Sequence, residues 1–291
     1  MSDIDFPSYK VASIQINPVI ADVDSNLVKI SEKIIEASKS GAVLVVLPEL
    51  ANTGYVFNSR EEAFSLAEMI PEGRTTQLLL KLSKDLNVYI ACGITEVDSN
   101  CLYNSSVLVG PYGYIGKYRK NHLWGAETLF FEPGDLGMPI FNTPIGRLGI
   151  VICYDGWFPE LYRLASMQGA DIICNCTNWV PMVGQPDDML PMANILAMGA
   201  AHSNALNIIC ADRCGTERSQ PFLGKSVIVG PEGWILAGPA SATEEETIYA
   251  MVNIKKTREA RQFNSHNNII RDRRDDLYDP MLGVNAPLSR W

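Results

Sequence analysis

Short runs of apolar and β-branched residues recur along this chain, and each lies beside a segment with helical spacing of apolar side chains. Val43–Leu47 is the clearest run, and its length is typical of a buried strand. The preceding segment, Asp24–Ser40, places Leu27, Ile30 and Ile34 on one face of a helix. This order of helix and buried strand predicts an α/β fold in which helices cover mixed sheets.

The same alternation continues through most of the sequence. We expect helices at 75–86, 159–168 and 188–205, strands at 88–92, 148–152, 172–174, 208–211 and 247–254, and hairpins over 102–117 and around 231–233. No linker rich in Pro, Gly or Ser divides the chain, so we expect one domain over residues 1–291. Residues 258–291 are dense in Arg and Asp and lack periodicity. They predict a C-terminal oligomerisation arm, with a solvated tail as the alternative.

Charge and cysteine content exclude several classes of protein. The formal net charge is −9, which argues against a nucleic-acid partner because phosphate backbones select basic surfaces. No apolar run is long enough to span a bilayer, and the first residues do not resemble a secretory leader. Seven cysteines, an odd number, favour free thiols in a reducing compartment. We therefore expect a cytoplasmic protein with no membrane contact.

Three segments carry residues suited to chemistry, each at the C-terminal end of a predicted strand. They are Leu47-Pro48-Glu49-Leu50, Tyr118-Arg119-Lys120-Asn121-His122-Leu123 and Gly149-Ile150-Val151-Ile152-Cys153-Tyr154-Asp155. Taken singly, Glu49 fits a structural ion pair, Lys120 a surface charge and Cys153 a buried thiol. Together they supply a nucleophile, a base for its proton and a cation for a developing oxyanion.

These segments resemble the Glu-Lys-Cys signature of the nitrilase superfamily of carbon–nitrogen hydrolases, and the resemblance covers nearly the whole chain. It extends to Glu-Thr-Leu-Phe-Phe-Glu-Pro-Gly-Asp at 127–135 and to Cys-Tyr-Asp-Gly-Trp-Phe-Pro-Glu at 153–160. The resemblance implies a four-layer α-β-β-α sandwich with two mixed β-sheets. It also implies a homodimer or higher homo-oligomer.

By the same resemblance, Cys153 is the nucleophile, Glu49 the general base and Lys120 the oxyanion stabiliser. Glu127 matches a second glutamate that orients the lysine and the substrate, and Glu132 is a nearby competitor for that role. The reaction is attack of the thiol on an amide-type carbon, loss of ammonia or an amine, and hydrolysis of a thioester by water. It needs no cofactor and no metal.

Residues beside the catalytic segments are nominated as substrate-binding: Tyr55, Trp124, Tyr154, Trp157, Asn178 and Trp179. The tryptophans favour an apolar or planar acyl group, or else they fill the core between sheets. No arginine lies beside Cys153 to bind a substrate carboxylate, although Arg213 and Arg218 could reach.

The leading hypothesis is hydrolysis of a small carboxamide to an acid and ammonia. An amidohydrolase of N-carbamoyl amines or amino acids, and a nitrilase, are the alternatives on the same residues; the sequence Cys153-Tyr154-Asp155 is closer to amidase-like members. A Cys–His pair of Cys153 with His122 or His202 is a further alternative. A non-catalytic binding protein on the same fold is a different class, which a substituted catalytic position would favour.

Overall fold

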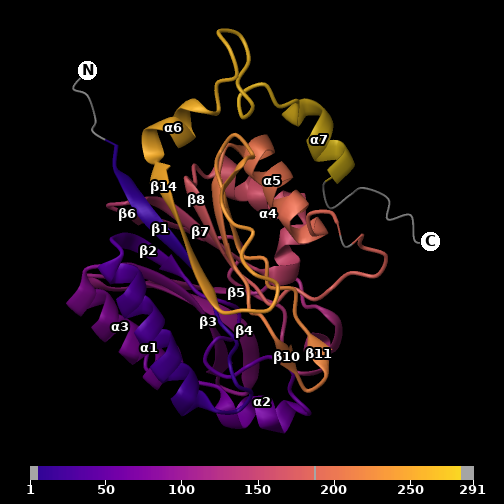
Figure 1. Ribbon diagram of the computed structural model, residues 1–291. Helices are drawn as coiled ribbons and strands as arrows, with labels where there is room; N and C mark the ends of the chain where they lie inside the picture. The colour runs from indigo at the N-terminus through magenta and orange to yellow at the C-terminus, as the bar shows by residue number, and fades with distance from the viewer. Residues whose placement is uncertain (1–5, 187, 283–291) are drawn as a thin grey trace.

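The computed structural model describes residues 6–186 and 188–282. Within these residues, two six-stranded mixed sheets pack face to face (Figure 1). The first sheet has the order β14 (Glu246–Asn253), β1 (Ser8–Gln15), β2 (Ala42–Val46), β3 (Tyr89–Asp98), β4 (Cys101–Gly110), β5 (Gly113–Arg119). The second has the order β13 (Ile235–Ala237), β12 (Val227–Val229), β9 (Asn207–Ala211), β8 (Ile172–Cys176), β7 (Gly146–Ile152), β6 (Ile140–Thr143).

Each sheet has three parallel strands with antiparallel strands on both sides. In the first sheet β1, β2 and β3 are parallel, and in the second β7, β8 and β9 are parallel. Parallel neighbours end at the same edge of a sheet, so the segments that follow them lie close together. A separate short ribbon pairs β10 (Thr216–Glu217) with β11 (Gln220–Pro221).

Helices cover the outer face of each sheet, which confirms the predicted α-β-β-α sandwich (Figure 1). Helices α1 (Val23–Lys39) and α3 (Arg74–Leu86) bury apolar side chains against the first sheet. Helices α4 (Pro159–Met167) and α5 (Met192–Asn204) lie on the second sheet. The remaining helices are α2 (Arg60–Leu66), α6 (Ile254–Glu259), α7 (Asp275–Leu282) and the 3₁₀ helices η1 (Gly125–Leu129) and η2 (Cys153–Trp157).

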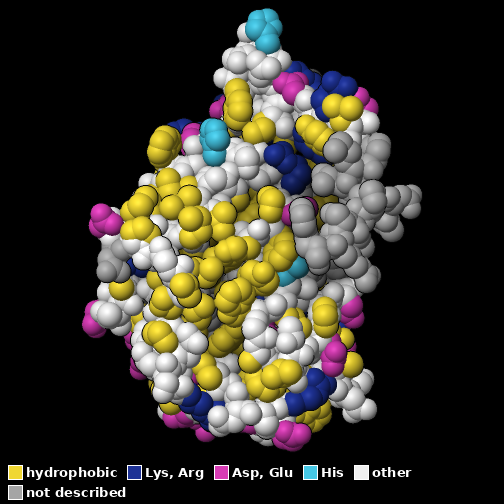
Figure 2. All heavy atoms as spheres, turned by 90° about the vertical axis from the view of Figure 1, so that its right-hand side faces the viewer, with side chains coloured by type: hydrophobic (Ala, Val, Ile, Leu, Met, Phe, Trp, Pro, Cys, Tyr) yellow, Lys and Arg dark blue, Asp and Glu magenta, His cyan; other side chains and the backbone are white. Residues whose placement is uncertain are grey.

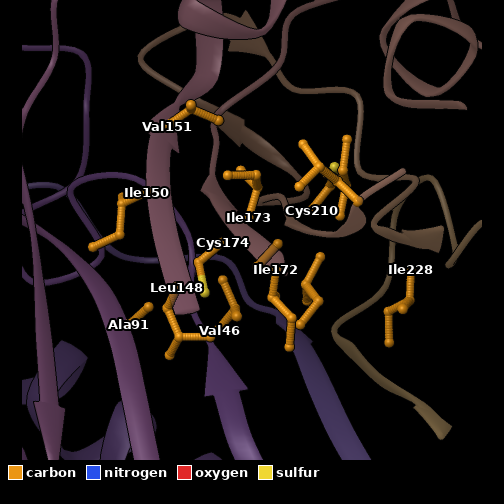
Figure 3. Packing of buried hydrophobic residues seen from close by; sticks show 14 of the residues in the cluster. Val46, Ala91, Leu148, Ile150, Val151, Ile172, Ile173, Cys174, Cys210 and Ile228 are labelled. Atoms are coloured by element: carbon orange, nitrogen blue, oxygen red, sulfur yellow. The ribbon is translucent and has the colours of Figure 1, made fainter. Parts of the chain in front are cut away.

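The core between the sheets is built from the apolar runs that the sequence marks as strands. Val46 and Ala91 from the first sheet pack with Leu148, Ile150 and Cys174 from the second (Figure 3). These side chains are buried from solvent. Their burial fixes the two sheets against each other and therefore fixes the strand ends that carry the polar segments.

The predicted helix over 188–205 is wrong at its start, because α5 begins at Met192. Pro191 takes the N-cap position with an extended backbone, and the residue before a proline disfavours helical geometry. Strands β1, β10 and β11 and helix α2 were not predicted. The strand expected over 247–254 ends one residue early, since the Asn253 side chain accepts a hydrogen bond from the Lys256 backbone N–H and starts α6.

The predicted arm contains the end of α6 and helix α7, which lie at one end of the molecule (Figure 1). Residues 1–5, where the sequence lacks a leader-like pattern, and residues 283–291 of the arm lie outside the described residues. In the described chain, every helix is too short or too polar to cross a membrane.

Candidate active site

Lys120 lies between two carboxylates in the interior of the protein. Its Nζ is 2.6 Å from Glu49 Oε1 and 2.6 Å from Glu127 Oε1. Asn104 Nδ2 donates a further hydrogen bond of 2.6 Å to Glu49 Oε1, and the Tyr55 hydroxyl donates one of 2.5 Å to Glu127 Oε1. The ammonium therefore shares its charge with both carboxylates, and each carboxylate receives a second donor.

Glu49 is held by tight backbone packing after β2. The next residue, Leu50, has a left-handed backbone with φ of 46°, which is uncommon for a non-glycine residue. Gly93 of β3 packs beneath this turn, and a Cβ there would lie 2.5 Å from the Glu49 Cα. Asn178 Nδ2 donates to the Glu49 carbonyl over 2.9 Å. The carboxylate thus projects from a backbone with little freedom to shift.

Lys120 follows β5, and Arg119 fixes the end of that strand. The Arg119 guanidinium donates to Glu96 Oε1 over 2.6 Å and to Asp135 Oδ1 over 3.0 Å. The Lys120 carbonyl accepts a hydrogen bond of 2.8 Å from the Gly134 backbone N–H. These contacts connect the lysine to β3 and to the segment that follows Glu127.

Cys153 begins η2 directly after β7. Its backbone is left-handed, with φ of 47°, a strained conformation of the kind that clusters at functional turns. The Cys153 backbone N–H donates to Asn175 Oδ1 of β8 over 3.2 Å. The next backbone N–H, that of Tyr154, lies in the first turn of η2, where helices have no internal acceptor.

Asp155 joins the cysteine turn to the lysine segment. Its buried carboxylate accepts from the Ile152 backbone N–H over 3.1 Å and from the Tyr118 hydroxyl over 2.7 Å. It also accepts from the His122 backbone N–H over 3.0 Å, and His122 Nδ1 lies 2.8 Å away. Asp155 therefore fixes where Cys153 stands relative to Lys120.

Burial and charge give the three groups different protonation behaviour. Burial raises the pKa of Glu49 to about 7, with Lys120 acting to lower it and Glu127 to raise it. Burial alone would lower the pKa of Lys120, but Glu127 and Glu49 raise it above its usual value. Burial and Glu49 raise the pKa of the Cys153 thiol well above its ordinary range. The resting site thus holds a neutral thiol, a protonated lysine and a carboxylate that titrates near neutrality.

A narrow pocket of about 20 Å³ opens at Cys153, which is room for about one water molecule. Its lining is mostly aromatic and apolar: Trp124, Cys153, Tyr154, Trp157, Asn178, Trp179, Val180 and Met182. Five of the six nominated substrate-binding residues are in this set. The sixth, Tyr55, donates its hydroxyl to Glu127, and its charge neighbours are Glu127, Glu49 and Cys153.

Other candidates from the sequence lie away from this pocket. Arg213 donates to Glu217 Oε1 over 2.6 Å, and Arg218 donates to Glu62 Oε1 over 2.5 Å, so the suggestion that either binds a substrate carboxylate is not supported. Glu132 accepts from Arg60 instead of approaching Lys120.

Neither histidine of the alternative Cys–His pair is hydrogen-bonded to Cys153. His122 is held by Asp155, and His202 lies on α5 with Nδ1 3.0 Å from the Glu232 carbonyl. Within residues 6–186 and 188–282, no group of three or more His, Cys, Asp or Glu side chains is arranged to hold a metal ion.

Sequence reasoning missed residues that support the charged centre. Asn104 lies on β4, where nothing in the sequence distinguishes it from an ordinary polar residue, yet its side chain donates to Glu49. Val180 and Met182 follow the predicted Asn178-Trp179 turn and carried no signal of their own.

Several buried atoms at the site have no hydrogen-bond partner among the described residues, including Glu49 Oε2, Glu127 Oε2 and Trp179 Nε1.

Comparison with known proteins agrees with this geometry. The carbon-nitrogen hydrolase family model matches residues 10–262. This chain belongs to the carbon–nitrogen hydrolase family. A protein of Pyrococcus abyssi named nitrilase is 45% identical to this hydrolase, over 92% of this chain and 98% of the relative.

Two further relatives share the family and the fold. An N-carbamoylputrescine amidase of Solanum lycopersicum is 31% identical to this carbon–nitrogen hydrolase, over 91% of this chain and 92% of the relative. A crystal structure of a carbon-nitrogen hydrolase from Helicobacter pylori G27 matches with a TM-score of 0.84 at 26% identity, covering 94% of this chain and 98% of that chain. The sandwich and its enzyme class are therefore shared with proteins that span the same length.

The site geometry predicts that Cys153 of this hydrolase is alkylated by iodoacetamide before any other thiol. Exposure alone predicts Cys101 instead, because it is the one cysteine of seven that is not buried. The role of base expected for Glu49 predicts that Glu49→Gln slows alkylation of Cys153 by about 10²-fold or more. Peptide mapping over a time course measures both rates.

Alkylation of Cys101 serves as the internal control, and its rate should be the same in wild type and Glu49→Gln. Modification of Cys101 first in wild type, with Cys153 inert, would contradict the assignment of the nucleophile.

Proposed function

We propose that this enzyme hydrolyses a small carboxamide to a carboxylic acid and ammonia through a thioester on Cys153. The observation that carries the proposal is the buried Lys120 bound by Glu49 and Glu127, beside a thiol whose pKa both Glu49 and Lys120 influence. A structural ion pair does not need a second carboxylate at equal distance, nor a strained cysteine turn beside it.

In the first half of the reaction, Glu49 takes the proton of the Cys153 thiol as sulfur attacks the amide carbon. The carbonyl oxygen gains negative charge, which the Lys120 ammonium and the Tyr154 backbone N–H stabilise. When the tetrahedral species collapses, the C–N bond breaks. The protonated Glu49 gives its proton to the departing nitrogen, and ammonia leaves.

In the second half, Glu49 takes a proton from water as the water oxygen attacks the thioester carbon. The same two donors stabilise the second oxyanion. The C–S bond breaks, the acid is released and the proton returns to Cys153. A base that titrates near pH 7 is suited to both directions of transfer, because general acid–base catalysis is most efficient when the pKa lies near the working pH.

Nitrile hydrolysis is a second candidate for the same residues. The specific observation in its favour is the relative from Pyrococcus abyssi, which is named nitrilase and is 45% identical. The thiol would attack the nitrile carbon instead of a carbonyl, and Lys120 would stabilise charge on nitrogen. The amide remains the leading substrate because Cys153-Tyr154-Asp155 resembles amidase-like members.

Hydrolysis of N-carbamoyl amines is less well supported. A relative of this class is named for a substrate with an amine tail, and an ammonium needs a partner when it is buried. None of the described side chains that line the Cys153 pocket carries a charge.

Ammonia release tests the proposal directly. Wild type, Cys153→Ala and Glu49→Gln are assayed with aliphatic and aromatic amides, dicarboxylic monoamides, N-carbamoyl compounds and nitriles. We expect wild type to release ammonia fastest from small amides, Cys153→Ala to release none, and Glu49→Gln to be slower by about 10²- to 10⁴-fold. Circular dichroism of each variant controls for folding.

Release of ammonia by Cys153→Ala at the wild-type rate would refute the nucleophile. If wild type releases ammonia from nitriles alone, nitrile hydrolysis replaces amide hydrolysis as the proposed function. If wild type releases no ammonia from any compound, a non-catalytic binding protein is favoured.

We also propose that two copies of this chain associate through the face that carries α4 and α5. Hydrophobic side chains gather over a broad area on this side of the molecule, seen face-on in Figure 2. Leu164 and Met167 of α4 and Ile195 of α5 are among the exposed apolar residues, and large exposed apolar areas commonly mark interfaces. The arm at 258–291 is the proposed segment of subunit exchange.

Light scattering coupled to size-exclusion chromatography should therefore give twice the mass of the chain. A Leu164→Lys, Met167→Lys double variant should shift the mass toward one chain, while Val28→Lys, at an even more exposed position on α1, should not. A wild-type mass of one chain at micromolar concentration would contradict the dimer.

A further inference from the structure

Met182 lines two separate pockets. One is the narrow pocket of about 20 Å³ at Cys153. The other is a larger pocket of about 270 Å³ formed by the segment that leads into α5, with Val183, Pro186 and Met189 among its lining residues. Among residues 6–186 and 188–282 no other residue lines both, so the Met182 side chain stands between the two spaces.

The narrow pocket at Cys153, called the inner pocket from here on, restricts the size and polarity of the acyl group. Trp124, Trp157 and Trp179 surround it with apolar surface, and its volume leaves little room beyond the reacting carbon. The backbone N–H of Trp179 donates to Asp212 Oδ1 over 2.8 Å, and the Trp179 side chain is buried. This aromatic wall is therefore anchored at its backbone.

Apart from the Glu49, Lys120 and Glu127 centre, the described residues offer no counter-charge at either pocket. In the part of the chain that the structure describes, neither lining contains Lys, Arg, Asp or Glu. The two arginines that the sequence suggested for a substrate carboxylate, Arg213 and Arg218, are paired with Glu217 and Glu62. Moving an ionised carboxylate or ammonium into apolar surroundings without a partner is strongly unfavourable.

We propose that the substrate has a short, uncharged acyl group and that Met182 sets the limit on its length. This inference rests on the proposed amide hydrolysis and refines it to a substrate class. The first carbons of the acyl chain lie between the tryptophans, and further carbons meet the Met182 side chain. The outer pocket lies beyond that side chain, so truncation of Met182 joins the two spaces into one apolar channel.

The test is a series of unbranched amides from acetamide to octanamide with wild type, Met182→Ala and Met69→Ala. Wild type should show kcat/KM that falls steeply past two carbons, because the inner pocket has room for about one water-sized group. Met182→Ala should gain about tenfold or more for hexanamide relative to acetamide, because each methylene in a hydrophobic pocket changes selectivity by roughly 10- to 200-fold. Met69 is exposed and lines neither pocket, so Met69→Ala should keep the wild-type profile.

Pairs of amides with the same shape, one charged and one neutral, test whether the acyl group must be uncharged. The 4-aminobutanamide cation has the shape of pentanamide, and succinamate has the shape of 4-methylpentanamide. In Met182→Ala, where both shapes fit, each charged amide should have a kcat/KM at least about tenfold below that of its neutral partner. Equal kcat/KM values for the charged and the neutral amide of either pair would overturn the proposal that the acyl group is uncharged.

A second readout does not require turnover. Cys153 is alkylated with 2-bromoacetamide and 2-bromohexanamide, and the rates are compared by peptide mapping. The ratio of long to short reagent should rise about tenfold or more in Met182→Ala and stay constant in Met69→Ala. An unchanged ratio, together with an unchanged amide profile, would refute the role of Met182. If no amide is hydrolysed but the alkylation ratio shifts, the proposed function fails and the pocket assignment stands.

Discussion

A buried ammonium between two buried carboxylates is the interaction on which this site depends. Lys120 alone in the interior would be strongly destabilising, and Glu49 beside Glu127 without a cation would be repulsive. With all three present, one positive charge is shared by two carboxylates at 2.6 Å each. The net negative charge that remains makes it easier for Glu49 to hold a proton, which is the property a general base at neutral pH needs.

The fold supplies this arrangement from the ends of strands. Glu49 follows β2, Lys120 follows β5 and Cys153 follows β7, so both sheets contribute to one centre. The core between the sheets is what holds these ends in register (Figure 3). Asp155 adds a polar connection across the sheets, because it binds the turn before Cys153 and the segment after Lys120 with the same carboxylate.

Much of this could be predicted from the sequence, for identifiable reasons. Apolar runs such as Val43–Leu47 mark strands because a doubly covered sheet buries both faces, and a charged residue that ends such a run must meet a partner. The start of α5 was misplaced because Asp188-Met189-Leu190 has helical composition, while Pro191 decides the boundary.

The contacts that hold the site residues in place were harder to predict, because they join segments that are far apart in the sequence. Asn104 pairs with Glu49 across 55 positions, and Tyr55 pairs with Glu127 across 72 positions. Gly93 carries no local signal for its close approach to Glu49. Five side chains nominated for their nearness in sequence to the catalytic segments line the Cys153 pocket, since η2 and the turn after β8 keep neighbours together; that they bind substrate stays a prediction.

The most direct test of the shared-cation account is the pH dependence of Cys153 alkylation by iodoacetamide in wild type and Glu127→Gln. In wild type the rate should fall as the pH drops through about 7, where Glu49 becomes protonated. In Glu127→Gln, Lys120 has Glu49 as its one carboxylate partner and Glu49 no longer faces a second negative charge. The pKa of Glu49 should therefore fall, and the midpoint of the alkylation rate profile should move to lower pH. A midpoint that stays in place or moves to higher pH in Glu127→Gln would contradict the account.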